Sequence, residues 1–237
     1  RRSLKGMTVA SYHRATAAQS ASAYKAGYHS ALGSLGRFFR RDFASFPRHQ
    51  GYLKADPARR AELRAHYEAL AQGRRIVGLS WRSKSETIGS QKSAELAEWR
   101  RILTTPGVLF VNLQYGECAG DLAAVKEKLG VEVVHDAGVD PLKDMDGCFA
   151  QVAAMDLVIS TSNTTVHVAG SQNVPCWVLL PRGHGSMWYW FLEREDNPWY
   201  PSLRLFRERQ EEWGKGPWWT GVVDRAGAEL PRWMEGR

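Results

Sequence analysis

The sequence predicts an α/β fold, a doubly wound, Rossmann-like parallel sheet preceded by a helical segment. From residue 75 onward, short apolar runs alternate with helix-forming stretches, which is typical of βαβ units. The connections between these stretches are short, as parallel crossover units require. The clearest unit joins the run 156–161 to the run 175–180 through one short helix, so ligands are expected beyond the carboxyl ends of the strands.

The first predicted domain, residues 1–55, is a helical segment followed by a connector. The alanine-rich stretch 15–26 favours a helix. An apolar stripe follows it and comprises Leu32, Leu35, Phe38 and Phe39. The basic run 37–41 fits either a patch for an acidic partner or membrane surface, or a solvated helix end with two core phenylalanines.

The second predicted domain, residues 56–237, opens with a helix over 57–72. Asp56 is a good N-cap, Pro57 suits the first helical position, and Gly73 can close the helix. The inward face of this helix is expected to hold Leu63, Tyr67 and Leu70. Strands are then predicted at 75–81, 107–113, 131–135, 156–161, 175–180 and 203–207, with helices at 93–104, 118–129 and 146–155.

Composition and charge narrow the class of protein. A hydrophobic content of 43% with ten tryptophans is ample for a core, and no run approaches the ~18 apolar residues of a transmembrane segment. The net charge of +7 favours anionic ligands, but the basic residues are scattered, so no nucleic-acid-binding module is predicted. The widely spaced cysteines are expected to be small core residues in a reducing, cytoplasmic compartment, and they are Cys118, Cys148 and Cys176.

Several motifs with a known chemistry do not occur in the sequence. There is no G-x-G-x-x-G after the first strand, no G-x-x-x-x-G-K-[ST] and no G-x-S-x-G, so nicotinamide, P-loop and α/β-hydrolase chemistry lose support. H-E-x-x-H and other metal-ligand spacings do not occur either, so no metal is expected. The first residue is not Met, which favours a trimmed piece of a longer chain.

The stretch 156–175 carries the strongest functional signal. Its strand runs into a polar cluster typical of helix starts, which comprises Ser162, Asn163, Thr164 and Thr165. A helix start offers unpaired backbone N–H groups and the positive end of the helix dipole, and His167 falls in the first turns of the same helix. We interpret this stretch as a diphosphate-binding turn. The competing interpretation is that it only caps a helix, as such turns do in any α/β domain.

Other strand ends supply further candidate contacts. The first strand ends at Trp81 and leads through a flexible loop to Lys92, whose ammonium group can meet a phosphate from the side opposite the turn. The second ends at Gln114, whose amide can recognise a base or ribose, and Gly116 permits close backbone approach. The third ends at residues 135–136, for which we expect structural or hydrogen-bonded roles. Ordinary loop roles stay open for Lys92, Gln114 and Gly116.

Residues 156–175 resemble the carboxyl-terminal nucleotide-sugar motif of the heptosyltransferase-like glycosyltransferases. In the ADP-heptose:lipopolysaccharide type this motif is written D-x-x-I-S-x-D-T-x-x-x-H-x-A-G and then Pro. The tail 192–207 is similar to the bacterial branch of that family that is fused to tetratricopeptide repeats, and the likeness covers residues 75–210. The resemblance implies a two-domain GT-B fold, of which this chain is expected to be the carboxyl-terminal, nucleotide-sugar-binding half plus a helical remnant.

The same resemblance suggests roles for individual residues. Lys92 matches the phosphate-contacting lysine of the family, and the turn 162–165 with His167 matches its diphosphate turn. Ser162 stands where the pattern has Asp, and Asn163 where it has Thr, so the sugar and the nucleotide need not be ADP-heptose. The catalytic base of the family lies in the amino-terminal domain, which residues 1–55 are too few to build, so no catalytic base is assigned.

The resemblance thus implies a metal-independent glycosyltransferase. It would bind a nucleotide-diphosphate sugar as donor substrate, need no other cofactor, and transfer the sugar to a protein or glycan acceptor. A longer chain is expected to add a Rossmann or repeat domain. Two alternatives stay open. One is a non-catalytic binding or scaffold module, which the loss of Asp at position 162 favours. The other is an epimerase-like enzyme, which the lack of paired carboxylates at the predicted strand ends disfavours.

Overall fold

The computed structural model describes residues 28 and 30–236, and the chain divides into two compact units, Arg1–Arg48 and His49–Arg237. The division falls a few residues before the boundary expected at residue 56. The alanine-rich stretch 15–26, for which the sequence predicts a helix, lies outside the described residues.

The described part of the first unit holds short helical turns, which are η1 Leu32–Ser34, α2 Gly36–Phe39 and η2 Phe43–Ser45. Asp42 begins η2 by accepting a hydrogen bond from the Ser45 backbone N–H at 2.8 Å. Phe38 and Phe39 are 60% and 63% exposed, so the expectation of two core phenylalanines is wrong. The reason is length, because a helix of four residues cannot build the apolar stripe that a longer helix would bury.

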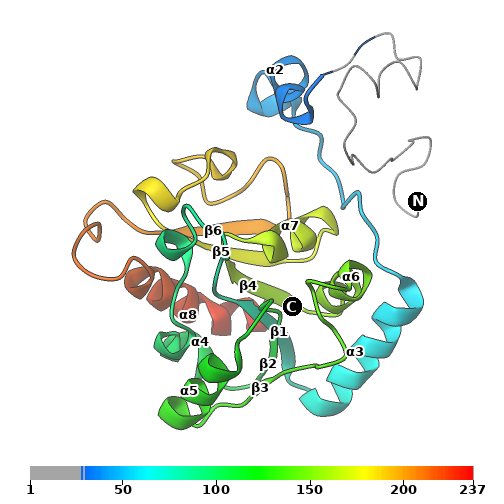
Figure 1. Ribbon diagram of the computed structural model, residues 1–237, viewed down its shortest axis with the longest axis vertical. Helices are drawn as coiled ribbons and strands as arrows, with labels where there is room; N and C mark the ends of the chain where they lie inside the picture. Colours follow the sequence, from blue (N-terminus) through cyan, green and yellow to red (C-terminus); the bar gives the residue numbers. More distant parts are fainter. Residues whose placement is uncertain (1–27, 29, 237) are drawn as a thin grey trace. The chain divides into compact units, whose positions relative to one another are not determined.

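The second unit is built on a six-stranded parallel sheet, which confirms the predicted fold class. Its strands are β1 Arg75–Ser80, β2 Val108–Asn112, β3 Val133–Val134, β4 Leu157–Thr161, β5 Cys176–Leu180 and β6 Leu203–Arg207. They lie in the order β3-β2-β1-β4-β5-β6, and each neighbouring pair is parallel. The chain therefore winds outward from β1 to one edge and returns to β4 beside β1 before it winds to the other edge, as a doubly wound sheet does (Figure 1).

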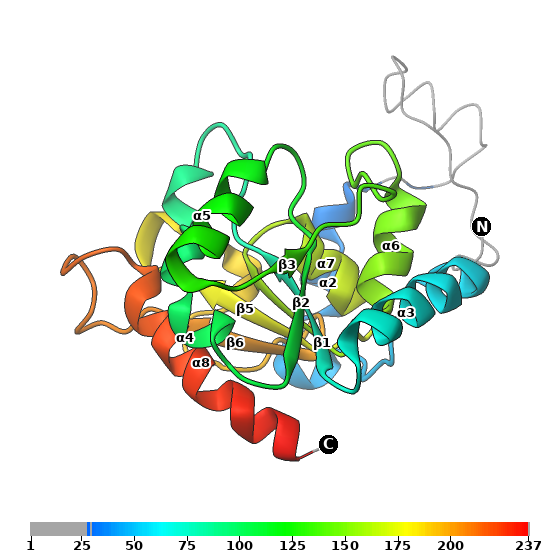
Figure 2. The ribbon, with the colours of Figure 1, turned by 90° about the horizontal axis from the view of Figure 1, so that it is seen from below.

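Helices cover both faces of this sheet (Figures 1 and 2). On one face lie α4 Arg100–Leu103, α5 Ala119–Leu129 and α8 Trp219–Glu235. On the other face lie α3 Pro57–Ala71, α6 Met145–Ala153 and α7 Thr164–Ser171. The first face packs around the buried side chains of Trp99 and Val222, and the second around Tyr67 and Val152. The three cysteines lie buried and free within these two cores, as expected.

Two of the predicted elements are shorter in the structure. The helix predicted at 93–104 is divided into a 3₁₀ turn, η4 Leu96–Glu98, and the short helix α4. Its first residues do not coil because the Ala94 backbone N–H donates to the Trp81 carbonyl at 2.9 Å, which holds this part of the chain against the end of β1. The strand predicted at 131–135 pairs only over β3, at the edge of the sheet.

The ends of the unit also differ from expectation. Helix α3 leaves the helical conformation at Gln72, which has a φ of 50°, one residue before Gly73. Leu70 is 40% exposed rather than inward, whereas Tyr67 is fully buried.

The carboxyl-terminal helix α8, which has no predicted counterpart, packs on β5 and α4. None of the described helices combines the length and the apolar character that a membrane-spanning helix needs.

Asp156, the residue before β4, joins three elements of the second unit. Its Oδ2 accepts a hydrogen bond from the Ile76 backbone N–H of β1 at 2.8 Å. Its Oδ1 lies 2.7 Å from Nη1 of Arg64 on α3. The first residue of the motif that resembles a nucleotide-sugar motif therefore has a structural role, since it holds the two central strands and α3 together.

Replacing Asp156 by alanine should therefore weaken the fold. We expect Asp156→Ala to lower the free energy of unfolding by about 2 kcal/mol, because a hydrogen bond and an ion pair to one partly buried carboxylate are lost. Glu127→Ala, which removes an exposed carboxylate from α5, should change it by less than about 0.5 kcal/mol. Urea denaturation measures both values, and equal effects would show that Asp156 does not join these elements.

Candidate functional site

The carboxyl ends of β1 and β4 lie side by side at the centre of the sheet, where doubly wound folds bind ligands. Ser80 of β1 is paired with Ser160 of β4. Beyond these residues, β1 leads into the loop that holds Lys92, and β4 turns into α7. The sequence predicts that the turn and Lys92 share one site, which stays a prediction. Burial and, second, the charge of Lys92 lower the pKa of His167 in α7.

Asn163 is the N-cap of α7 and ties the turn to β1. Its Oδ1 accepts a hydrogen bond from the Thr165 backbone N–H at 2.9 Å, as capping residues do. Its Nδ2 donates to the Ser80 hydroxyl at 2.8 Å and to the Arg82 carbonyl at 3.0 Å. The amide is thus engaged inside the protein, and its role is to place the start of α7 over the end of β1.

The other residues of the predicted turn differ in what they offer to a ligand. Ser162 is 1% exposed, and its hydroxyl accepts a hydrogen bond from the indole N–H of Trp190 at 2.8 Å. Thr165 is also buried, at 3% exposure. Of the four turn residues, all of which the structure describes, Thr164 alone is exposed. The side chain that can reach a ligand from this turn is therefore that of Thr164.

Lys92 is a buried cation. It ends the 3₁₀ turn η3 Ser90–Lys92 and is only 7% exposed. Burial lowers the pKa of Lys92, and no carboxylate in the described part of the chain forms an ion pair with it. Buried lysines are usually paired with an acid, because an ammonium group loses its hydration on burial. Burial thus leaves Lys92 without a compensating carboxylate among the described residues.

His167 lies one turn into α7 within a shell of aromatic rings. Its Nδ1 is 3.1 Å from the Tyr200 hydroxyl. Its ring is stacked on Trp190, with 5.4 Å between centroids and 17° between planes, and meets Tyr189 edge-on at 5.3 Å. Burial and, second, the charge of Lys92 lower the pKa of His167, so the imidazole is neutral at neutral pH.

The sequence does not predict that aromatic residues surround His167, although the tryptophans near the carboxyl terminus, Trp190 among them, favour packing over stacking on a sugar or base. Trp190, Tyr189 and Tyr200 all come from the connection between β5 and β6. The density of aromatic residues between 188 and 200 is visible in the sequence, but it equally suits core packing. Only the contacts in the structure show that this connection surrounds His167 and covers Ser162.

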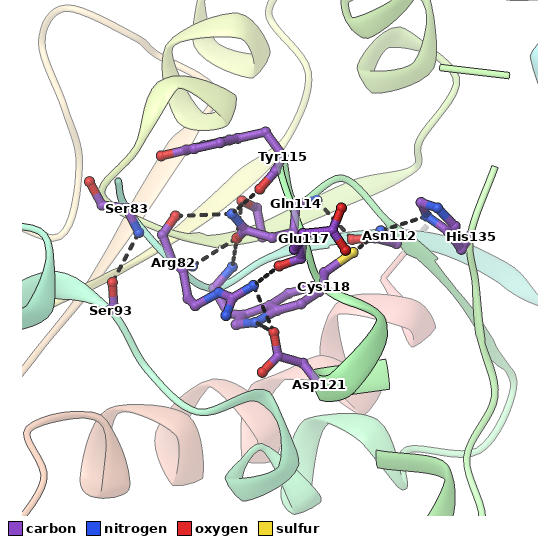
Figure 3. A network of polar contacts seen from close by, with 12 residues as sticks. Arg82, Ser83, Ser93, Asn112, Gln114, Tyr115, Glu117, Cys118, Asp121 and His135 are labelled. Atoms are coloured by element: carbon purple, nitrogen blue, oxygen red, sulfur yellow. Dashed lines mark hydrogen bonds and ion pairs between the residues drawn. The ribbon is translucent and has the colours of Figure 1, made fainter. Parts of the chain in front are cut away.

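Gln114, a predicted ligand contact, lies inside a polar network (Figure 3). Trp81, a second predicted contact, takes part in the same network. The Gln114 Oε1 accepts hydrogen bonds from the Trp81 and Arg82 backbone N–H groups at 2.9 and 2.8 Å, and its Nε2 donates to the Tyr115 carbonyl at 3.1 Å. Trp81 is fully buried, and its indole N–H donates to Asp121 at 3.1 Å. The polar groups of both side chains are therefore engaged within the protein.

Gly116 has a φ of 73°, which favours glycine, and a side chain there would collide with the exposed Lys84. A ligand that approached Gly116 would therefore meet the Lys84 side chain. The third strand end has the structural roles expected of it. Asn112 hydrogen-bonds the His135 ring at 2.8 Å, and Asp136 accepts a hydrogen bond from the Tyr67 hydroxyl at 3.1 Å. In the described part of the chain, no three His, Cys, Asp or Glu side chains gather as metal ligands would.

Comparisons with known proteins give one related sequence and several similar structures. The sequence matches no protein-family model. Protein FlbA of Caulobacter vibrioides is 39% identical over 186 residues, which cover 77% of this chain and 30% of that protein. The chain therefore spans less than a third of the length of this relative.

Two solved structures are similar in part. A glycosyl transferase family 9 protein from Veillonella parvula has a TM-score of 0.46 at 18% identity over 68% of this chain and 43% of its own. The E. coli ADP-heptose lipopolysaccharide heptosyltransferase II has a TM-score of 0.49 at 14% identity over 82% of this chain and 59% of its own.

The interaction of Lys92 with His167 can be tested directly. Lys92→Met removes the charge with little change in volume, so we expect the pKa of His167 to rise while staying below its ordinary value, because burial remains. An NMR pH titration of the imidazole C–H signals measures this pKa. Lys143→Met, at a side chain that is 85% exposed, is the control and should leave it unchanged. An unaltered His167 pKa in Lys92→Met would mean that the two groups do not interact.

Proposed function

We propose that residues 56–237 form the nucleotide-sugar-binding domain of a metal-independent glycosyltransferase. The observation that carries this proposal is the buried Lys92, which forms no ion pair with a described carboxylate and whose charge lowers the pKa of His167 in α7. Its charge, the exposed hydroxyl of Thr164 and the N–H groups of the first turn of α7 together suit a diphosphate. The motif resemblance of residues 156–175 is a second, independent support.

The chemistry follows from the charge that develops on the leaving group. When the bond between the anomeric carbon and the diphosphate oxygen breaks, the electron pair stays with the diphosphate. The acceptor oxygen forms the new bond to that carbon and gives up its proton to a base that we do not assign. Lys92 and the start of α7 would stabilise the leaving diphosphate, as fixed donors do in other enzymes, where one such donor contributes roughly 3 kcal/mol.

The donor is proposed to be a nucleotide-diphosphate sugar, and the acceptor a protein or a glycan. A catalytic base and the acceptor site would come from a further domain, of the Rossmann or repeat kind, in a longer chain. The three buried, free cysteines support a reducing, cytoplasmic setting for this reaction.

A non-catalytic binding or scaffold module is the second candidate function. The observation that favours it is the covering of Ser162, whose hydroxyl is occupied by Trp190 where the similar family has a carboxylate. Such a module would bind a nucleotide or its sugar conjugate through the same Lys92 without turning it over.

Binding of nucleotide diphosphates and nucleotide sugars should raise the melting temperature of this chain, since a ligand that binds the native state stabilises it. We expect one nucleotide series to bind, and Lys92→Met to weaken its binding about 10- to 100-fold, because a charge-assisted hydrogen bond is lost. Lys143→Met should bind as the wild type does. A panel without any shift at saturating ligand, for a chain that melts cooperatively, would contradict the diphosphate site.

A further inference from the structure

The segment of residues 49–53 is seated on the carboxyl-terminal end of α7, the helix whose amino-terminal end forms the proposed phosphate site. The Tyr52 and Leu53 backbone N–H groups both donate to the carbonyl of Ser171, the last residue of α7, at 2.8 and 3.0 Å. Carbonyls at a helix end lack hydrogen-bond donors inside the helix, and the 49–53 segment supplies the donors for the Ser171 carbonyl. The proposed site and the segment therefore lie at the two ends of one helix.

The close contact of the 49–53 segment with the end of α7 depends on Gly51. This residue has a φ of 86°, and a Cβ atom there would lie 2.8 Å from the Gln172 carbonyl carbon and 3.1 Å from the Asn173 nitrogen. Both are backbone atoms, which cannot move aside as the end of a flexible side chain can. Any residue larger than glycine at position 51 would therefore push the segment away from α7.

A second contact fixes the segment to the aromatic connection around His167. The His49 ring accepts a hydrogen bond from the Gly51 N–H on Nδ1 at 3.1 Å, so its Nε2 carries the proton and donates to the Trp199 carbonyl at 3.0 Å. The neighbouring Tyr200 is held by Asn197, whose Oδ1 accepts the Tyr200 backbone N–H at 3.1 Å.

The side chains of the segment and the site meet in a chain of three groups. The Tyr52 hydroxyl is hydrogen-bonded to the Tyr200 hydroxyl, and the Tyr200 hydroxyl lies 3.1 Å from Nδ1 of His167. Each hydroxyl has a single hydrogen to donate. The direction of the Tyr52–Tyr200 hydrogen bond therefore sets the direction of the hydrogen bond between Tyr200 and His167. If Tyr52 donates to Tyr200, then Tyr200 donates to Nδ1, and the neutral imidazole carries its proton on Nε2.

We propose that the 49–53 segment is a positioning element that, through Tyr52 and Tyr200, holds His167 as the Nε2–H tautomer. An Nε2–H group is a hydrogen-bond donor, which suits an anion beside Lys92. The reverse order would place a lone pair on Nε2, which would repel phosphate oxygens. The role of this donor toward a diphosphate rests on the proposed function, whereas the tautomer itself does not. A displacement of the segment from α7 would therefore affect the proposed site by two routes, through α7 itself and through the contacts of Tyr200.

The tautomer can be read without any ligand from the ¹⁵N chemical shifts of the His167 ring, above its pKa. We expect the wild type to carry the proton on Nε2 and Tyr200→Phe to lose this preference, because Nδ1 then lacks its partner. Tyr200→Phe should also weaken nucleotide-diphosphate binding about 3- to 10-fold, the loss expected for one neutral hydrogen bond. A wild-type imidazole protonated on Nδ1 would overturn the proposal.

The role of the segment is tested by a matched pair of glycine variants. Gly51 and Gly73 share a φ of 86°, but an added Cβ meets backbone atoms at Gly51 and nothing within 4 Å at Gly73. Backbone strain is therefore equal in Gly51→Ala and Gly73→Ala, and only the first displaces the segment. We expect Gly51→Ala to reduce the Nε2–H population and to weaken binding about 3- to 10-fold relative to Gly73→Ala.

The outcomes separate this proposal from the proposed function. If Lys92→Met abolishes binding while Gly51→Ala and Tyr200→Phe match Gly73→Ala in tautomer and affinity, the diphosphate site stands and the positioning role is refuted. If the wild type binds no nucleotide while the tautomer still responds to Gly51→Ala and Tyr200→Phe, the positioning role stands and the proposed ligand is refuted.

Discussion

The side-chain amide of Asn163 is the link on which the candidate site depends. Its oxygen caps α7 and its nitrogen binds the hydroxyl and carbonyl groups at the end of β1, so one buried group aligns two elements that are distant in sequence. This link adds a direct tie between the start of α7 and the end of β1 to the packing of α7 on the sheet. The position of Asn163 is itself set by the pairing of β1 with β4, where the winding direction of the sheet reverses.

A buried cation without an acid is the second constraint. The loop after β1 carries Lys92 into the protein, where burial disfavours its charged form and no described carboxylate compensates for it. The neutral His167 nearby responds to the same charge, because a second cation beside the first would be repelled. A phosphate would relieve both effects at once. The burial of the Lys92 charge and the position of the site, where the winding direction of the sheet reverses, thus both favour a phosphate ligand.

Helix α7 connects the functional features of the second unit. Its first turn belongs to the proposed phosphate site, its middle carries His167 against Trp190 and Tyr200, and its last carbonyl accepts hydrogen bonds from the 49–53 segment. The helix has only eight residues, so these contacts lie within two turns of one another. A short helix that is held at both ends moves as one body, which is why a segment at one end can affect the ring of a histidine in the middle.

How much the sequence predicts depends on the range of the interaction. The alternating apolar runs predict the parallel sheet, and the run of Ser, Asn and Thr predicts the capped start of α7, since both signals are local in the chain. Ligand roles for Gln114 and Trp81 were reasonable from their place at strand ends, yet their polar groups turn inward to partners about 32 to 40 residues away. The likeness of residues 156–175 to a motif gives no sign that Asp156 pairs with Arg64, some 92 positions earlier.

The sequence by itself determined the fold class, the order of the strands and the place of the polar turn, because backbone propensity and apolar periodicity are written in neighbouring residues. Only the tertiary structure decided that Lys92 is buried without an ion pair to any described carboxylate, that Trp190 covers Ser162, and that Tyr52 reaches His167 through Tyr200. These contacts arise when segments far apart in the chain pack together, and the hydrogen bonds and burial that result have no local signature.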